Sequence, residues 1–362
     1  MDTFAFIIHP IDPKRDVSRK YPFLGWLFNE RQINFLSSFF PPVYISEIEG
    51  VRSAATGKEI KGWLVACPLT PARMLELPES VAYRKIIQTG RLAERLGAKI
   101  LGLGAFTSVV GDAGITVARQ LDVPVTTGDA YTVATAVEAL REAARLLEIP
   151  LARATAAVVG ATGATGRICA ELLAQDTAEV FLIGRHLPAL EQVRQAIQDH
   201  GAAARLQIST DLEDLSKAHL IISVTSALGA VIHPERLQPG SVVCDVARPR
   251  DVSARLVASR KDVLVIDGGI VEVPGEVNFN FDFGLPTSRA YACMAETMAL
   301  ALEGRFEDYT LGRDFTRSHV EEIAAIARRH GFHLSGFRSF DQEVTPEHLA
   351  AVRLHAFRRF HQ

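Results

Sequence analysis

The sequence of 362 residues is long enough for two domains with separate hydrophobic cores and an appendage. Its charged fraction of 22% and net charge of -3 provide no field that attracts polyanions, so nucleic acid is not expected as a partner. The N-terminal apolar run is too short for a signal peptide, and every other apolar stretch falls short of the roughly 18 residues of a membrane span. The sequence therefore predicts a cytoplasmic protein without a membrane span.

The cysteines are few, widely spaced and without C-x-x-C pairing, which predicts free thiols rather than disulfides. His330 and His333 in "HGFH" suggest a metal, but no further ligand cluster lies nearby. We therefore expect no metal site, and Gly331 is predicted to end a helix there.

Alternating strand and helix patterns predict an α/β fold, and residues 1–150 are expected to form an α/β substrate-binding domain. Two predicted helices of this part end near Gly97 and near Leu121, and a long last helix is capped by Thr127 or Asp129. The predicted strands are 43–51, 59–69, 99–106 and 123–127, and the two longer helices are 79–97 and 129–148.

Residues 151–286 show a more regular alternation, with short apolar strands separated by helices of ten or more residues. Such a pattern implies right-handed crossovers and a doubly wound parallel sheet of Rossmann-like type. The predicted strands are 155–160, 179–185, 206–210, 220–226, 242–247 and 263–269, and the predicted helices are 166–176 and 187–201. This part is expected to bind a dinucleotide.

The loop "VVGATGATGR" lies between the first strand and the first helix of that unit. Missing side chains there allow a tight turn and let backbone N–H groups approach a pyrophosphate at the helix N-terminus. The spacing is G-x-x-G-x-x-G, so Ala161 takes the place of the first glycine in the usual G-x-G-x-x-G frame. A purely structural turn is the alternative. The residues expected to bind the cofactor here are Gly160, Thr162, Gly163, Ala164, Thr165 and Gly166.

Cofactor choice is read after the second strand, where an acidic residue would bind the ribose 2′-hydroxyl of NAD. The sequence "LIGRH" has Arg185 there, and a guanidinium can hold a 2′-phosphate, which predicts NADPH. A solvated surface arginine is the alternative. Gly268 and Gly269 follow the last predicted strand at the edge where cofactors lie, so we expect them to approach the nicotinamide, although close packing explains them as well.

Residues 287–362 are expected to be a helical region that carries Cys293, with helices over 288–304, 317–330 and 346–361. Cys293 lies five residues beyond Ser288, in the second turn of the first of these helices. The helix dipole and Arg289 lower a thiol pKa only modestly there, so the residues alone leave a buried thiol and a nucleophile both open.

Several segments around Cys293 resemble the long-chain acyl-[acyl-carrier-protein] reductase family. These are "GATGATG", "GGIVEVPG", "PTSRAYACMAETMALALEGRFEDYTLGR" and "ARRHGF", preceded by "LGLGAFTSVV" and "VTTGDAYTVATAV". The resemblance covers about residues 55 to 335. It departs from the family at Asp129, where an asparagine is expected, in the first 50 residues and beyond Gly336.

The resemblance implies that fatty acyl thioesters, on acyl carrier protein or CoA, are reduced to fatty aldehydes with NADPH through an acyl-cysteine intermediate at Cys293. Both tetrahedral species in such a reaction need donors for an oxyanion, which Thr107, Ser108, Thr126 and Thr127 can offer. Capping of the following helices is the alternative for these four hydroxyls. Ser108 and Thr127 are taken as candidate catalytic residues.

Glu296 follows the cysteine by three residues and shares its helix face, so it is a candidate catalytic residue that relays protons. An internal salt bridge is the alternative. In the last helix, Leu349, Val352, Ala356 and Phe360 form an apolar stripe that is expected to pack against the protein's own body or a partner in a homo-oligomer. Docking of an acidic acyl carrier protein on its arginines is a second hypothesis.

Two other functions remain open at this point. One is an NAD(P)-dependent dehydrogenase of the shikimate or amino-acid type, which "DVARPRDV" and the two-domain plan would suit. The other is a dinucleotide-sensing protein without turnover.

Overall fold

The chain forms two units, and each is built around its own sheet. Unit 1 contains residues 1–131, 271–315 and 319–333, and the rest of the chain forms unit 2. The computed structural model describes residues 1–340 and 342–361. The expected boundaries near 150 and 286 differ from this division, because the chain changes unit within helix α8 and the segment with the cysteine helix belongs to unit 1.

The sheet of unit 1 has the strand order β2-β3-β1-β4-β5. Its strands are β1 (Asp2–Ile8), β2 (Val43–Arg52), β3 (Glu59–Ala66), β4 (Leu101–Leu103) and β5 (Val125–Thr126). All neighbours pair in parallel except β2, which is antiparallel to β3. The four strands predicted for this region are confirmed, and β1 is an additional strand in the middle of the sheet.

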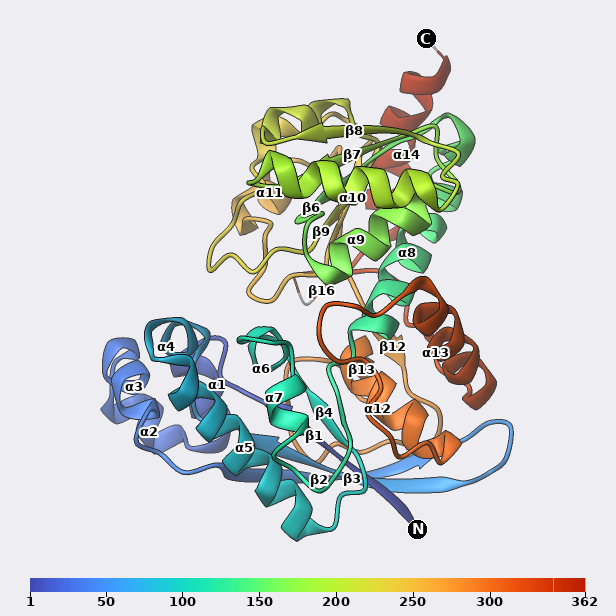
Figure 1. Ribbon diagram of the computed structural model, residues 1–362. Helices are drawn as coiled ribbons and strands as arrows, with labels where there is room; N and C mark the ends of the chain where they lie inside the picture. The colour runs from blue at the N-terminus through green and yellow to red at the C-terminus, as the bar shows by residue number, and fades with distance from the viewer. Residues whose placement is uncertain (341, 362) are drawn as a thin grey trace. The chain divides into compact units, whose positions relative to one another are not determined.

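Helices cover both faces of this sheet (Figure 1). Ala5, Ile7 and Val65 pack with Ile86 of α5 on one face. On the other face α12 contacts β1, β3 and β4, and a Cβ on Gly102 of β4 would lie 2.1 Å from Thr297 of α12. The helices are α1 (Pro13–Lys20), α2 (Pro22–Leu27), α3 (Glu30–Ser37), α4 (Pro71–Glu76), α5 (Glu79–Leu96), α6 (Phe106–Val109), α7 (Ile115–Ala118), α12 (Ala292–Glu303) and α13 (Arg317–His330).

Unit 2 contains a six-stranded sheet of order β11-β10-β9-β6-β7-β8, and every pair in it is parallel. This order confirms the predicted doubly wound α/β fold. Its strands are β6 (Thr155–Val159), β7 (Glu179–Ile183), β8 (Arg205–Ser209), β9 (Leu220–Ser223), β10 (Val242–Asp245) and β11 (Leu264–Asp267). Its helices are α8 (Asp129–Leu146, from Thr132), α9 (Ala164–Leu173), α10 (Leu187–Asp199), α11 (Ala254–Ser259) and α14 (Pro346–His361), with short 3₁₀ turns at 151–153, 212–217 and 234–236.

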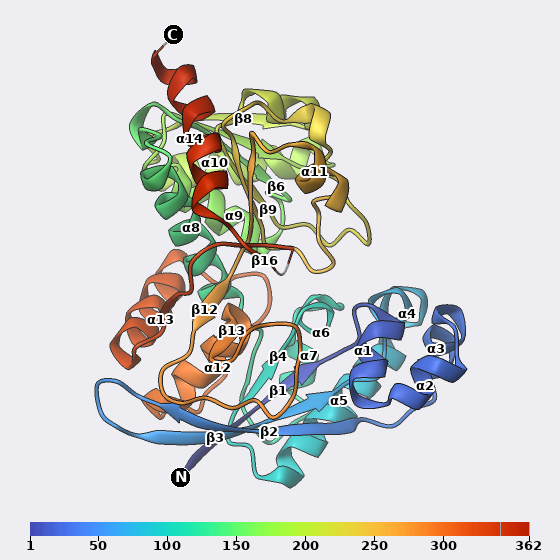
Figure 2. The same cartoon turned by 180° about the vertical axis from the view of Figure 1, so that it is seen from behind.

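The C-terminal helix α14 packs against unit 2 itself (Figure 2). Val352 and Ala356 are buried, and a Cβ on Gly240 would lie 2.4 Å from the Ala356 nitrogen. Phe360 stacks on His219 with ring centroids 4.5 Å apart. The apolar stripe of this helix therefore lies on the chain's own body, as one of the two sequence hypotheses expected.

The segment after Thr287 differs from its prediction. The helices 317–330 and 346–361 are confirmed as α13 and α14, but residues 288–291 are not helical. Ser288 has a left-handed backbone (φ +67) and residues Arg289–Tyr291 form strand β13, so α12 begins only at Ala292. The remaining strands are short: β12 (Ile270–Glu272), β14 (His333–Leu334), β15 (Arg338–Ser339) and β16 (Gln342–Glu343). None of the described helices is both long and apolar enough to span a membrane.

Candidate active site

Cys293 is the second residue of α12 and lies in its first turn, not in the second turn as predicted. The N-cap Tyr291 has an extended backbone and makes no side-chain capping bond, so the first N–H groups of the helix remain available to an anion. Every residue from Ala292 to Leu302 is buried except Cys293, which keeps partial exposure. Cys293 is therefore the residue of this stretch that keeps some surface open to solvent.

The segment that follows β5 lies directly against Cys293. Gly128 has a left-handed backbone (φ +79), and a Cβ placed on it would lie 2.3 Å from the Cys293 Cα and 2.4 Å from its Cβ. Only glycine allows both this backbone conformation and this approach. The next residue, Asp129, is partly exposed like Cys293, whereas the preceding Thr126 and Thr127 are buried.

Glu296 joins α12 to two other segments of unit 1. Its carboxylate is completely buried and accepts hydrogen bonds from the Thr126 hydroxyl at 2.5 Å, the Tyr131 N–H at 2.8 Å and the Thr310 hydroxyl at 2.8 Å. The Thr127 N–H also donates to the Thr310 carbonyl at 2.9 Å. Because these partners are neutral donors, Glu296 holds the loop beside Cys293 by hydrogen bonds rather than by a salt bridge. Sequence reasoning did not foresee Thr310.

The four hydroxyls that were candidate oxyanion donors have different surroundings. Thr107 and Ser108 each donate to the backbone carbonyl three residues earlier, at 2.8 and 2.7 Å, as in helix-start turns. Thr126 donates to Glu296. The Thr127 hydroxyl is buried, and among the described residues it has no hydrogen-bond partner. Thr127 is thus the candidate with a donor left to offer.

The electrostatics around Cys293 disfavour a resting thiolate. Burial raises the pKa of the thiol to about 12, and the nearby Asp129 carboxylate raises it further than Glu296 does. The backbone N–H groups of Met294 and Cys293 oppose this effect and lower the pKa in part. Attack by this cysteine therefore requires a group that removes its proton.

Asp129 is a candidate for that group, because its carboxyl lies close enough to influence the Cys293 thiol. Burial, followed by the charge of Glu296, raises the pKa of the Asp129 carboxyl to about 7. A carboxyl with a pKa near 7 is half ionised at neutral pH, which suits a proton acceptor. Sequence reasoning did not consider Asp129 for this role, although the departure from the expected asparagine at this position was visible.

The glycine loop of unit 2 has the geometry of a phosphate cradle. Gly160 has φ +89, and a Cβ on Gly166 would lie 2.2 Å from the Gly160 carbonyl oxygen, so α9 approaches the loop as closely as a backbone can. Gly163 is the N-cap of α9 and makes no side-chain bond. The N–H groups of Ala164 and Thr165, in the first turn, are left to bind phosphate oxygens. These residues fit the pyrophosphate of a dinucleotide.

Arg185 is exposed just beyond the end of β7, and no ion pair of the described residues includes it. A Cβ on Gly184 would lie 3.5 Å from Thr162 of the glycine loop, so the loop reaches this end of the strand. Gly268 lies against strand β10: a Cβ there would lie 2.9 Å from the Cys244 sulfur. Close packing therefore accounts for the glycine at position 268. Gly269 has a left-handed backbone (φ +73), a conformation that favours glycine.

His330 has a structural environment. It is buried, with Nδ1 2.8 Å from the Ser53 hydroxyl and Nε2 2.8 Å from the Glu303 carboxylate. Gly331 has φ +102 and ends α13 as predicted, and His333 is exposed. Within residues 1–340 and 342–361, no group of three or more His, Cys, Asp or Glu side chains is arranged to hold a metal ion. All four cysteines are free there, and Cys67, Cys169 and Cys244 are fully buried.

Comparisons with known proteins agree with an oxidoreductase-type dinucleotide-binding fold. The family model described as shikimate / quinate 5-dehydrogenase matches residues 141–267, which lie in unit 2. Among solved structures, L-tryptophan dehydrogenase from Nostoc punctiforme shares 12% identity and a TM-score of 0.40, over 99% of this chain and 88% of that one. A likeness this distant says nothing about activity.

Two curated relatives cover both units. A protein named aminotransferase PigE, from Serratia sp., is 34% identical over 306 residues, which are 81% of this chain and 34% of that protein. The chain thus spans about a third of the length of this relative. A protein named long-chain acyl-[acyl-carrier-protein] reductase, from Synechococcus elongatus, is 29% identical over 347 residues, which are 91% of this chain and 98% of that protein.

The contact between Gly166 and Gly160 predicts the effect of one added methyl group. In the Gly166→Ala variant the methyl carbon must displace the Gly160 carbonyl, which lies 2.2 Å away. We expect NADPH affinity, measured by fluorescence titration, to fall at least about tenfold, and the free energy of unfolding to fall by about 1–3 kcal/mol. Gly163→Ala is the control for stability, because its nearest atom lies at an ordinary 3.4 Å. Unchanged NADPH affinity in Gly166→Ala would contradict the assignment of the cradle.

Proposed function

We propose that the protein is a cytoplasmic, NADPH-dependent reductase of long-chain fatty acyl thioesters, carried by acyl carrier protein or CoA, that releases fatty aldehyde through an acyl-Cys293 intermediate. The observation that carries the proposal is the partial exposure of Cys293 in a helix whose other residues from Ala292 to Leu302 are all buried. The name of the Synechococcus elongatus relative, which matches over nearly its whole length, supports the same reaction. Free thiols suit a reducing compartment.

In the acylation step, the Cys293 sulfur forms a bond to the thioester carbonyl carbon, and the bond from that carbon to the carrier sulfur breaks. The thiol proton passes to the Asp129 carboxylate, directly or across one water molecule, and then to the departing carrier thiolate. This transfer avoids a free thiolate, whose formation burial opposes. The first-turn N–H groups of α12 and the Thr127 hydroxyl donate to the oxyanion that forms at the carbonyl.

Glu296 is a positioning residue in this scheme. The hydrogen bonds that it accepts from Thr126, Tyr131 and Thr310 hold the loop that carries Thr127 and Asp129 against α12, so the donor and the proton acceptor stay beside the cysteine. Ser108 remains a weaker candidate, because its hydroxyl is engaged with a backbone carbonyl.

The glycine loop and Arg185 would hold the cofactor, whose reduced nicotinamide supplies the hydride that converts the acyl-cysteine to a thiohemiacetal. Collapse of that species breaks the bond from carbon to the Cys293 sulfur and releases the aldehyde, and one proton taken up from solvent through Asp129 restores the thiol. Asp129 is then again available for the proton of the next thiol. Gly268 and Gly269 remain our candidates for the nicotinamide edge of the site.

Arg185 is expected to decide between NADPH and NADH. In Arg185→Ala the charge-assisted hydrogen bonds to the 2′-phosphate are lost, so the preference in kcat/KM for NADPH over NADH should fall by about 10- to 100-fold. Steady-state rates with both cofactors give this ratio. Arg205→Ala removes another exposed arginine of unit 2 and should leave the ratio unchanged. A preference that survives in Arg185→Ala would show that the 2′-phosphate is read elsewhere.

Asp129 gives the reaction a defined pH dependence. Because only its ionised form accepts a proton, the rate of acyl transfer should rise with pH through about 7 and then level off. In Asp129→Asn we expect a rate about 10²- to 10⁴-fold lower, without this inflection. Rapid-quench acylation across the pH range measures both.

Stability provides the control for that variant. Since the pKa of Asp129 is raised, its ionisation disfavours the folded state as pH rises from the ordinary carboxyl range through about 7. Asp129→Asn should therefore unfold no more easily than the wild type above pH 7, and a loss of activity cannot come from unfolding. An unaltered pH profile in this variant would exclude Asp129 as the proton acceptor.

A dehydrogenase of the shikimate type is the second candidate, because that family model matches residues 141–267. The deciding assay follows NADPH oxidation and aldehyde formation with a long-chain acyl-CoA and an acyl carrier protein substrate, in parallel with NADP⁺ reduction by shikimate and amino acids. Stoichiometric aldehyde from the thioesters supports the reductase. NADP⁺ reduction by a hydroxy or amino acid, with no aldehyde from either thioester, would favour the dehydrogenase.

A further inference from the structure

Two short helices near the N-terminus expose large apolar side chains. Trp26 has 80% and Phe39 71% of its surface exposed, and their neighbours on α2, α3 and the segment after α3 are also open to solvent. We call this set the aromatic patch; its members are Phe23, Trp26, Leu27, Phe35, Phe39 and Phe40. Scattered exposed apolar residues are ordinary, but six within 18 positions of one another mark an interaction surface.

The helices that carry the patch are held in place by their opposite sides. A Cβ on Gly25 of α2 would lie 1.7 Å from the Ser18 hydroxyl of α1, so these helices pack closely. In α3, Ile33 is buried, and Asn29 and Gln32 form a reciprocal capping box. The rings also pair at the surface, Phe23 with Trp26 and Phe35 with Phe39, at centroid distances of 6.1 and 5.5 Å. The patch is therefore presented by folded helices.

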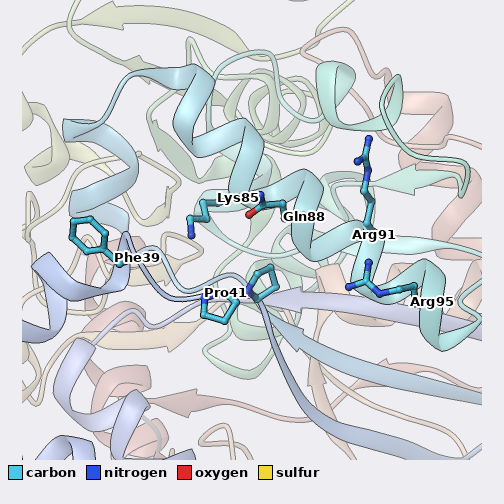
Figure 3. Close-up of a pocket in the computed structure, with 7 residues that line it drawn as sticks. Phe39, Pro41, Lys85, Gln88, Arg91 and Arg95 are labelled. Carbon is cyan, nitrogen blue, oxygen red and sulfur yellow. The ribbon is translucent and has the colours of Figure 1, made fainter.

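A cationic hollow borders the patch at Phe39. It has a volume of about 540 Å³, and Figure 3 shows Lys85, Arg91 and Arg95 projecting from α5 beside the segment that carries Phe39. Its other lining residues are Pro41, Pro42 and Gln88, so the lining contains no acid. None of the three cations forms an ion pair with a described residue, and Lys85 donates to the Phe40 carbonyl at 2.7 Å. The hollow is thus suited to an anion such as a phosphate.

We propose that the aromatic patch and the cationic hollow together dock unit 1 on an anionic phospholipid membrane. The rings enter the boundary between headgroups and acyl chains, and Lys85, Arg91 and Arg95 bind headgroup phosphates. Exposed aromatic and leucine side chains beside unpaired cations are the combination by which interfacial helices bind anionic lipid. No transmembrane helix is needed for such peripheral binding.

A second copy of this chain fits the surface less well. A symmetric contact through the patch would bring the three unpaired cations toward the same three cations of the other copy, with no acid in the hollow to offset them. The cationic hollow is lined by α5, which packs on one face of the sheet of unit 1, whereas α12 with Cys293 packs on the opposite face. The proposal therefore does not depend on the function proposed for Cys293.

The test is co-sedimentation of the full chain with phosphatidylcholine vesicles, with and without about a third phosphatidylglycerol. We expect binding to the anionic vesicles only, weakened by salt, with a blue shift of Trp26 emission; the other tryptophan, Trp63, is buried and should contribute little to the shift. Trp26→Ser with Phe39→Ser should lower the partition coefficient at least about tenfold. Arg91→Glu with Arg95→Glu should remove the preference for anionic vesicles.

Leu354→Ser is the matched control, since it removes an exposed leucine from unit 2 and should bind like the wild type. Circular dichroism confirms that each variant is folded. Three results would overturn the proposal: wild-type protein that stays in the supernatant with both vesicles, equal binding to neutral and anionic vesicles, or undiminished binding by the Trp26/Phe39 variant. A dimer in light scattering that this variant dissociates, without vesicle binding, would assign the patch to a second copy instead. Acyl-thioester turnover without vesicle binding would likewise reject only this proposal.

Discussion

Cys293→Ala should reduce fatty acyl thioester turnover by about 10⁴-fold or more, because no other described thiol is exposed at a helix start to replace it. The other three cysteines are completely buried, so a substrate cannot reach their sulfur atoms. Steady-state NADPH oxidation with a long-chain acyl-CoA measures the loss.

The variant also separates chemistry from cofactor binding. The glycine loop belongs to unit 2, so the Kd of NADPH for Cys293→Ala should stay within about twofold of the wild-type value. Cys169→Ala removes a buried thiol and should lower stability modestly while turnover persists. Turnover by Cys293→Ala at more than about a tenth of the wild-type rate would exclude an acyl-Cys293 intermediate.

Gly128→Ala should lower turnover strongly, although it adds only one methyl group. The new carbon would meet the Cys293 Cα at 2.3 Å and its Cβ at 2.4 Å, on a backbone whose φ of +79 disfavours any side chain. Relief of this clash must move the loop with Thr127 and Asp129 away from the cysteine. We expect turnover to fall at least about 10²-fold, since displacements near 1 Å have that effect, and the free energy of unfolding to fall by about 1–3 kcal/mol.

Gly57→Ala provides the comparison, because Gly57 has φ +68 with no atom within 4 Å of the added carbon. It carries the backbone strain without the clash, so it should lose about 1 kcal/mol of stability and keep its turnover. Urea denaturation and initial rates on both variants measure these quantities. Equal turnover in Gly128→Ala and Gly57→Ala would show that the loop need not lie against Cys293.

The fold of unit 2 was predictable because its signals are local. Each strand is a short apolar run, the predicted helices α9 and α10 have 10 and 13 residues, and the glycine loop stands between β6 and α9. The N-terminal helices were not predicted, because α1, α2 and α3 have only six to eight residues, and α2 exposes Phe23, Trp26 and Leu27 to solvent. A short helix that leaves its rings in solvent has no clear amphipathic pattern.

The site in unit 1 was predictable only in part. Cys293 and Thr127 are candidates that the sequence already offered. The start of α12 was not predicted, since "PTS" has the composition of a cap while Ser288 has a left-handed backbone and its carbonyl accepts from the Val273 N–H. The bonds of Glu296 reach Thr126, 170 positions away, and Thr310. The placement of Asp129 near Cys293 likewise depends on packing between distant segments. Such pairs follow from the tertiary fold, which no local pattern encodes.

The most direct measurement is the intact mass of the protein after mixing with a long-chain acyl-CoA, before and after addition of NADPH. The wild type should gain the mass of one acyl group, and NADPH should remove it with release of one aldehyde, while Cys293→Ala gains nothing. Mass that remains unchanged with both acyl-CoA and acyl carrier protein substrates, or an adduct that forms equally on Cys293→Ala, would contradict catalysis through acyl-Cys293.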